Sequence, residues 1–115
     1  MVSQTLEHLY DVPRALRGLW GRLKPGGFLF TSCPALSIPH MEPFHFTSFT
    51  PTGLAAALEA SGFAVAELGL WGNADYARRL FATRAWPSFR DLDRPVENDP
   101  MVPAGVWALA MRPLE

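Results

Sequence analysis

Apolar positions near the N-terminus recur every three or four residues, which is the spacing of one face of a helix. They are Leu6, Leu9, Val12, Leu16, Leu19, Trp20 and Leu23. Asp11 precedes Val12 and Pro13, an order typical of an N-cap followed by a proline in the first turn. The segment KPGG, residues 24–27, then ends the pattern, because proline disfavours helical geometry before it and glycine permits turns. The spacing predicts a helix over 12–23.

The next segment, FLFTSCPA, is apolar at both alternating sets of positions. Such a run is typical of a strand that is buried on both faces. Residues 36–49 contain two prolines and two histidines without a steady period and are predicted to form a loop. Thr50 and Pro51 then begin a second helix as its N-cap and first residue, and Gly62 ends it.

The last third of the chain predicts two strands around a polar insertion. Residues 63–70 alternate as expected for a strand with one more exposed face. Residues 73–103 are polar and proline-bearing, with a short helix predicted at 75–83, and GVWALAMRP forms a strand that ends at Pro113. This order predicts an α/β layer architecture. Residues 1–115 then form a single domain in which 73–103 are an insertion before the last strand.

Composition narrows the function classes. Of the 115 residues, 49% are hydrophobic and 18% charged, which is a globular composition. Ten basic and eleven acidic residues give a net charge of −1 without a basic cluster, which argues against a nucleic-acid partner. The absence of an apolar run of about 20 residues and of a leader-like start argues against a membrane partner and favours a cytoplasmic protein. Cys33 is the only cysteine, so an internal disulfide is excluded.

Four segments together resemble a known family. They are QTLEHLYDVPRALRGLWGRLKPGGFLFTSCP, the histidine and proline of the following loop, FTPTGLAAALEASGF and VWALAMRP. Each piece is short, but their order and spacing resemble the C-terminal half of class I S-adenosylmethionine-dependent methyltransferases of the type 11 and type 23 kind. The resemblance covers nearly the whole chain.

The resemblance implies a partial Rossmann-like methyltransferase fold without its N-terminal half. The expected α/β structure is a three-stranded mixed sheet from strands at 28–32, 64–70 and 106–111. The last strand would lie antiparallel in the middle, and helices from Val12 and from Pro51 would cover the faces of the sheet.

The resemblance also implies S-adenosylmethionine as the cofactor. The family holds it mainly with a glycine-rich loop and an acidic residue that binds the ribose hydroxyls, and this sequence contains no GxGxG. Charge-assisted hydrogen bonds contribute roughly 1.5 to 3 kcal/mol each, so loss of that carboxylate alone would weaken binding by about 10² to 10⁴ fold. We therefore expect this chain alone to bind the cofactor poorly or not at all.

By resemblance, the segment after the family's fourth strand lies beside the cofactor and the substrate. This carries over to Ser3, Gln4 and Glu7 as cofactor-binding candidates. His8 is the candidate catalytic residue, because an imidazole titrates near neutral pH and can act as a general base or orient the acceptor. Otherwise Gln4 would belong to a frayed terminus, and Glu7 and His8 would only solvate the entrance of a helix.

The predicted loop at 36–49 supplies the candidate substrate residues. His40, Met41 and His45 would lie at the carboxyl end of the sheet, where open α/β folds bind ligands. No metal site is expected, because two histidines five residues apart with one glutamate give no complete ligand set. The aromatic residues of this loop and the four tryptophans are interpreted as packing.

Three functions remain open. The first is methyl transfer to an unknown small-molecule acceptor, completed by a separate N-terminal half. The second is a non-catalytic remnant or a protein-interaction module of methyltransferase descent. In both, the strand at 28–32 would leave a free edge that favours a homo-oligomer or a partner complex. The third is a small-ligand binding protein that uses the loop 40–49.

Overall fold

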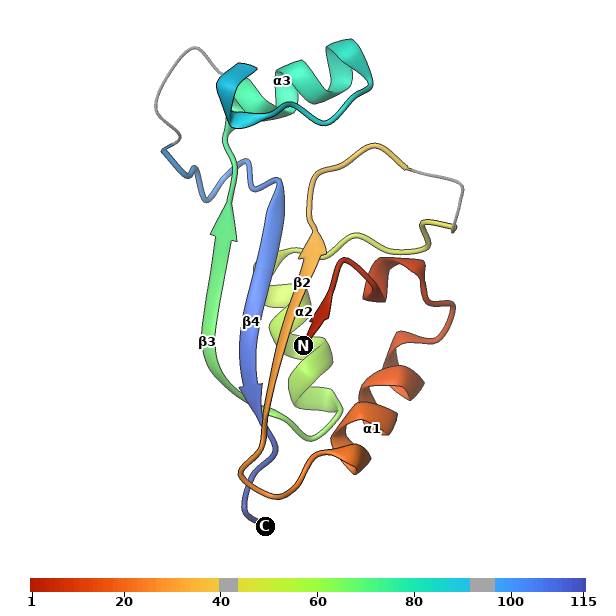
Figure 1. Cartoon of the computed structure of the whole chain (residues 1–115). Helices are drawn as coiled ribbons and strands as arrows, with labels where there is room; N and C mark the ends of the chain where they lie inside the picture. The colour runs from red at the N-terminus through yellow and green to blue at the C-terminus, as the bar shows by residue number, and fades with distance from the viewer. Residues whose placement is uncertain (40–43, 92–96) are drawn as a thin grey trace.

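A computed structural model describes residues 1–39, 44–91 and 97–115, and its centre is a four-stranded mixed sheet (Figure 1). The strands lie in the order β1 (Val2–Ser3), β2 (Phe28–Pro34), β4 (Gly105–Met111) and β3 (Ala64–Trp71). The last strand of the chain, β4, lies in the middle and runs antiparallel to both neighbours. The predicted mixed sheet with an antiparallel last strand is confirmed.

The sheet has four strands and not the three that were expected. The additional strand, β1, runs parallel to β2 and pairs Val2 with Thr31 and Ser3 with Ser32. Two residues are too few for any alternation to be visible in a sequence, which is why the pattern did not predict this strand.

The helices begin where the sequence supplies side-chain caps. The α-helices are α1 (Val12–Arg22), α2 (Pro51–Ala60) and α3 (Ala74–Thr83), and the two 3-10 helices are η1 (Leu6–His8) and η2 (Phe89–Asp91). Asp11 accepts a hydrogen bond from the backbone N–H of Arg14, and Thr50 accepts one from Gly53. Gly62, just beyond α2, has a φ of 96°, a conformation that side chains disfavour.

The main hydrophobic core lies on one face of the sheet. Leu29 and Cys33 of β2 and Ala108 of β4 pack in one buried cluster with Leu16 of α1 and Leu54 of α2. These side chains are 3% exposed or less. The helices α1 and α2 therefore cover the same face, and Figure 1 shows α2 behind the strands.

The opposite face of the sheet, which we call the open face, differs from the prediction. Phe28 was expected to lie in a strand buried on both faces, but its side chain is 55% exposed. Phe30 and Trp107 on the same face stack with their ring centroids 5.9 Å apart and are only half-buried. Trp107 lies against Gly69, where any Cβ atom would collide with the indole. In the part of the chain that the structure describes, the main core cluster packs α1 and α2 against the face opposite to the open face.

Arg112, which follows β4, forms hydrogen bonds with the C-terminal end of α1. Its Nη1 donates hydrogen bonds to the carbonyl oxygens of Trp20 and Leu23, at 3.1 and 2.7 Å. Its guanidinium lies 3.8 Å from the centre of the Trp20 ring. A cation at this end of a helix satisfies the last carbonyl groups and interacts favourably with the helix dipole.

Across the described ranges, no helix is long and apolar enough to span a membrane.

Candidate functional site

The candidate site is a cavity of about 220 Å³ at the end of the sheet where the parallel strands β1 and β2 finish. The chain segments that follow these strands meet the end of β3 and the start of β4 there. The cavity is lined by Gln4, Glu7, His8, Pro34, Leu36, Ser37, Trp71, Tyr76, Trp86 and Ala104. The carboxyl end of parallel strands is where open α/β sheets bind ligands.

The chain leaves β1 through a strained turn. Gln4 has a φ of 47°, which is uncommon for a residue with a side chain. Its backbone N–H donates to the carbonyl oxygen of Ser32 at 2.8 Å, and this bond holds the turn against β2. Ser3 forms a hydroxyl–hydroxyl bond of 2.7 Å with Ser32. Ser3 is therefore tied to the strand beside it and does not line the cavity.

Glu7 lies on η1 and contributes a buried carboxyl group to the cavity. Its side chain is 1% exposed, and Oε2 has no hydrogen-bond partner among the residues that the structure describes. The other oxygen, Oε1, lies 3.5 Å from Nε2 of His8. An unsatisfied buried oxygen costs free energy, so this atom is the strongest local indication of a missing ligand group.

The imidazole of His8 is oriented by the loop opposite. Nδ1 lies 2.9 Å from the carbonyl oxygen of Phe44. Because a carbonyl oxygen only accepts, Nδ1 carries the proton of this bond. Nε2 is then the atom that can exchange a proton with a ligand, and it is the one that faces Glu7.

The described part of the loop places His45 next to His8 and outside the cavity lining. The two rings meet edge-on with centroids 6.1 Å apart, and Nε2 of His45 lies 3.0 Å from the hydroxyl oxygen of Ser48. His40 and Met41, the other two candidate substrate residues, lie outside the described residues. Of the residues predicted from the sequence, the structure thus brings Gln4, Glu7 and His8 together at one cavity.

Cys33 is a buried residue of β2, and the pKa of its thiol responds to the charge of Glu7. Burial, together with the nearby negative charge of Glu7, raises the pKa of this thiol to about 12. The thiol therefore stays protonated at neutral pH and is not a nucleophile.

Three aromatic residues form the far wall of the cavity, and the two tryptophans among them were expected to be packing residues. Trp71 ends β3, Tyr76 lies in the first turn of α3 and Trp86 follows that helix. The rings of Trp71 and Tyr76 meet edge-on with centroids 5.3 Å apart. A tryptophan in a core and one in a ligand site look the same in sequence, so only the tertiary arrangement distinguishes them.

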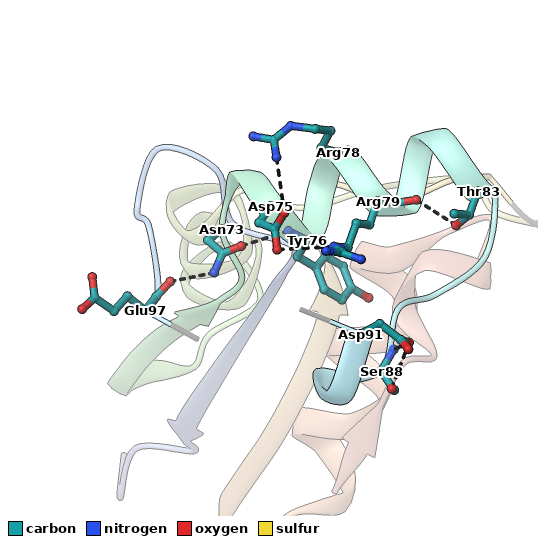
Figure 2. Close-up of polar contacts among 9 residues, drawn as sticks. All are labelled: Asn73, Asp75, Tyr76, Arg78, Arg79, Thr83, Ser88, Asp91 and Glu97. Carbon is teal, nitrogen blue, oxygen red and sulfur yellow. Dashed lines mark hydrogen bonds and ion pairs between the residues drawn. The ribbon is translucent and has the colours of Figure 1, made fainter. Parts of the chain in front are cut away.

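Polar contacts fix the helix that carries Tyr76 (Figure 2). The side chain of Asn73 accepts from the N–H of Tyr76 at 2.9 Å and donates to the carbonyl oxygen of Glu97 at 3.1 Å. Asp75 pairs with Arg78 and Arg79 one turn further on. After the helix, Asp91 accepts hydrogen bonds from the N–H and the hydroxyl of Ser88, which lower the pKa of its carboxyl group.

Within the described ranges, no group of three or more His, Cys, Asp or Glu side chains is placed to hold a metal ion. The cavity instead combines one buried carboxyl group, one imidazole and three aromatic rings. This set can bind an organic ligand and exchange a proton with it at Nε2 of His8.

Three solved structures share the fold of this chain. An S-adenosylmethionine-dependent methyltransferase from Mesorhizobium loti is 19% identical, with a TM-score of 0.55, and the match covers 96% of this chain. A chain of the complex between the Haloferax volcanii Trm112 methyltransferase activator and a methyltransferase is 15% identical, with a TM-score of 0.59 and 96% coverage. The cyclase SpnF is 20% identical, with a TM-score of 0.56 and 99% coverage.

The chain spans 59%, 52% and 50% of the length of these three proteins. No protein-family model matches the sequence, and no curated protein does. At these identities the likeness establishes the α/β fold, and a single fold hosts several activities.

Proposed function

We propose that this chain, which has the fold of S-adenosylmethionine-dependent methyltransferases, forms the acceptor-binding side of such an enzyme. The reaction would be methyl transfer to a small molecule in the cytoplasm. The observation that carries the proposal is the buried Oε2 of Glu7, which no described residue meets with a hydrogen bond, beside His8 at a cavity at the end of β1 and β2.

The size of the cavity supports a divided site. Pockets that hold a drug-sized ligand measure roughly 300 to 1,000 Å³, and this cavity measures about 220 Å³. The described residues can therefore enclose an acceptor or one end of the cofactor. Residues beyond these 115, in the same polypeptide or in a partner, would enclose the rest.

S-adenosylmethionine, when bound, supplies a methyl group on a positively charged sulfur that is already strongly electrophilic. The work of this chain is then to position the acceptor, which can account for much of the rate. Gln4 and Glu7 would accept or donate hydrogen bonds to the bound molecules. Nε2 of His8 would orient the attacking atom and take its proton.

A second candidate function is a non-catalytic interaction module of the same descent. The open face favours it, because Phe28, Phe30 and Trp107 present apolar side chains on a face that α1 and α2 do not cover. Exposed apolar faces of this kind mark sites of protein association. In this alternative, a partner protein would bind the open face of the sheet, and the cavity would not catalyse a reaction.

Calorimetric titration with S-adenosylhomocysteine separates the two. We expect no saturable binding by the 115-residue chain, and binding in the micromolar range once the product of the adjacent upstream coding sequence is joined or added. Micromolar binding by the chain alone would contradict the divided site. No binding in either sample, with both folded by circular dichroism, would reject the methyltransferase proposal in favour of the interaction module.

A further inference from the structure

The aromatic wall of the cavity is held in place before any ligand arrives. The Trp71 indole lies against Gly105, where a Cβ atom would collide with it. Tyr76 is 9% exposed and its ring packs edge-on against Trp71. Trp86 is 55% exposed and borders the opening. The faces of such rings carry negative electrostatic potential.

The carboxyl group of Glu7 is the acidic group of the same cavity. Its Oε2 is buried and has no hydrogen-bond partner within the described part of the chain, and the charge of Glu7 raises the pKa of the Cys33 thiol. A buried carboxylate oxygen is stable only when a donor or a cation meets it.

The balance of charge selects the class of ligand. The described residues that line the cavity include one glutamate, one histidine and no lysine or arginine. The histidine is His8, whose Nε2 lies 3.5 Å from Oε1 of Glu7. An anionic ligand would meet a carboxyl group and the negative faces of aromatic rings. A cation would be attracted by both, and aromatic walls around a buried carboxylate are the usual recognition chemistry of alkylammonium groups.

We propose that the cavity formed by Glu7, Trp71, Tyr76 and Trp86 binds an organic cation, and that this cation is an alkylammonium group of the acceptor substrate. Assigning this cation to the acceptor rests on the proposed function, because the sulfonium of the cofactor is also an organic cation. The cavity is large enough for a trimethylammonium group and too small for the whole cofactor.

The test compares a cation with its neutral isostere. Choline and 3,3-dimethylbutan-1-ol have nearly the same shape and differ in charge, so their affinities report charge recognition alone. Each is titrated into the folded 115-residue chain by calorimetry. We expect choline to bind at least about 10-fold more tightly, the discrimination that one or two cation–π contacts supply.

Matched variants place the effect in this cavity. Glu7→Gln keeps the shape and removes the charge, and it should lower choline affinity about 10-fold or more while the neutral alcohol is unaffected. Glu59→Gln, at an exposed position on α2, should change neither affinity.

Trp86→Leu should weaken choline binding, whereas Phe81→Leu, an exposed aromatic of α3 outside the cavity lining, should not. Equal affinities for the two isosteres, or choline binding that ignores both Glu7→Gln and Trp86→Leu, would overturn the proposal.

The cofactor is distinguished by a separate arm. S-adenosylmethionine and S-adenosylhomocysteine differ by one methyl group and one positive charge. If Glu7→Gln removes a preference for the former while choline fails to bind, the cation is the sulfonium and the ammonium assignment is wrong. If choline binds as expected but the completed assembly never binds S-adenosylhomocysteine, the cation site is correct and the methyltransferase proposal fails.

Discussion

At the scale of single residues, the buried thiol of Cys33 makes the stability of the chain depend on pH in the alkaline range. Its pKa is about 12 in the folded chain, against an ordinary value of 9.0. Between these two values the folded chain keeps a proton that the unfolded chain loses. The free energy of unfolding should therefore be unaffected by this group below pH 9 and fall as the pH rises toward 12, by at most about 1.4 kcal/mol per pH unit.

Urea unfolding at several alkaline pH values measures this slope, and Cys33→Ala is the control because it lacks the thiol. We expect the slope of the natural chain to exceed that of the variant. A thiol reagent at pH 8 should likewise fail to label the folded chain. Equal slopes, or rapid labelling under native conditions, would show that Cys33 is accessible and not held in its neutral form.

Single residues also mark how far the sequence could predict the site. Glu7 and His8 were identified because their neighbours resemble a family motif. Nothing in the local sequence indicated that the oxygen atoms of Glu7 would be buried, because that depends on the loop whose residues 46 and 47 donate to its backbone carbonyl oxygen. The distinction between a ligand site and a core for Trp71 and Trp86 depends on contacts with residues far away in the chain.

At the scale of elements, α3 connects stability to ligand binding, because its N-cap Asn73 precedes the ring of Tyr76 by three residues. Asn73→Ala should lower the free energy of unfolding by about 1 kcal/mol, a usual cost of losing an N-cap. It should also weaken choline binding, because the first turn of α3 would no longer hold Tyr76 in the wall of the cavity. Thermal or urea unfolding and calorimetry measure the two effects.

The equivalent cap of α1 provides the control. Asp11→Ala removes the bond from Arg14 and should lower stability by a similar amount, but choline affinity should stay unchanged because α1 contributes no residue to the cavity lining. If both variants weaken binding equally, the loss reflects general destabilisation and α3 has no specific part in the site.

Elements with strong local signals were predicted well. Caps and a helical period marked α1 and α2, apolar runs marked β2 and β4, and alternation marked β3, each within a few residues of its observed bounds. The strand β1 was missed because it is two residues long and depends entirely on pairing with β2. The side on which each helix packs was also missed, because hydrophobic periodicity shows which face of a helix is buried but not which face of the sheet receives it.

At the scale of the whole molecule, the open face has consequences for association. Apolar side chains on a sheet that α1 and α2 cover on one face only favour self-association or capture of a partner. In sedimentation velocity at micromolar concentrations, we expect species heavier than the 12.7 kDa chain. Phe28→Ser should shift the distribution toward monomer, and Phe81→Ser on α3 should not. A sharp monomer at all concentrations would contradict this.

The whole-molecule fold could be predicted because the order of segments, and not any one motif, carried the resemblance. The function is less determined, since structures of similar fold include both methyltransferases and the cyclase SpnF. Both proposals accordingly depend on one structural claim, that the ligand site lies at the end of β1 and β2, between η1 and α3.

Nuclear magnetic resonance of the nitrogen-15-labelled chain during a choline titration tests that claim most directly. The four tryptophan indole N–H signals report four places in the molecule. We expect the signals of Trp71 and Trp86 to move saturably. Those of Trp20, which is bonded to the Gly62 carbonyl oxygen, and of Trp107 on the open face should stay in place. Movement of Trp107 or Trp20 instead, or no movement of any of the four, would contradict a ligand site at this end of the sheet.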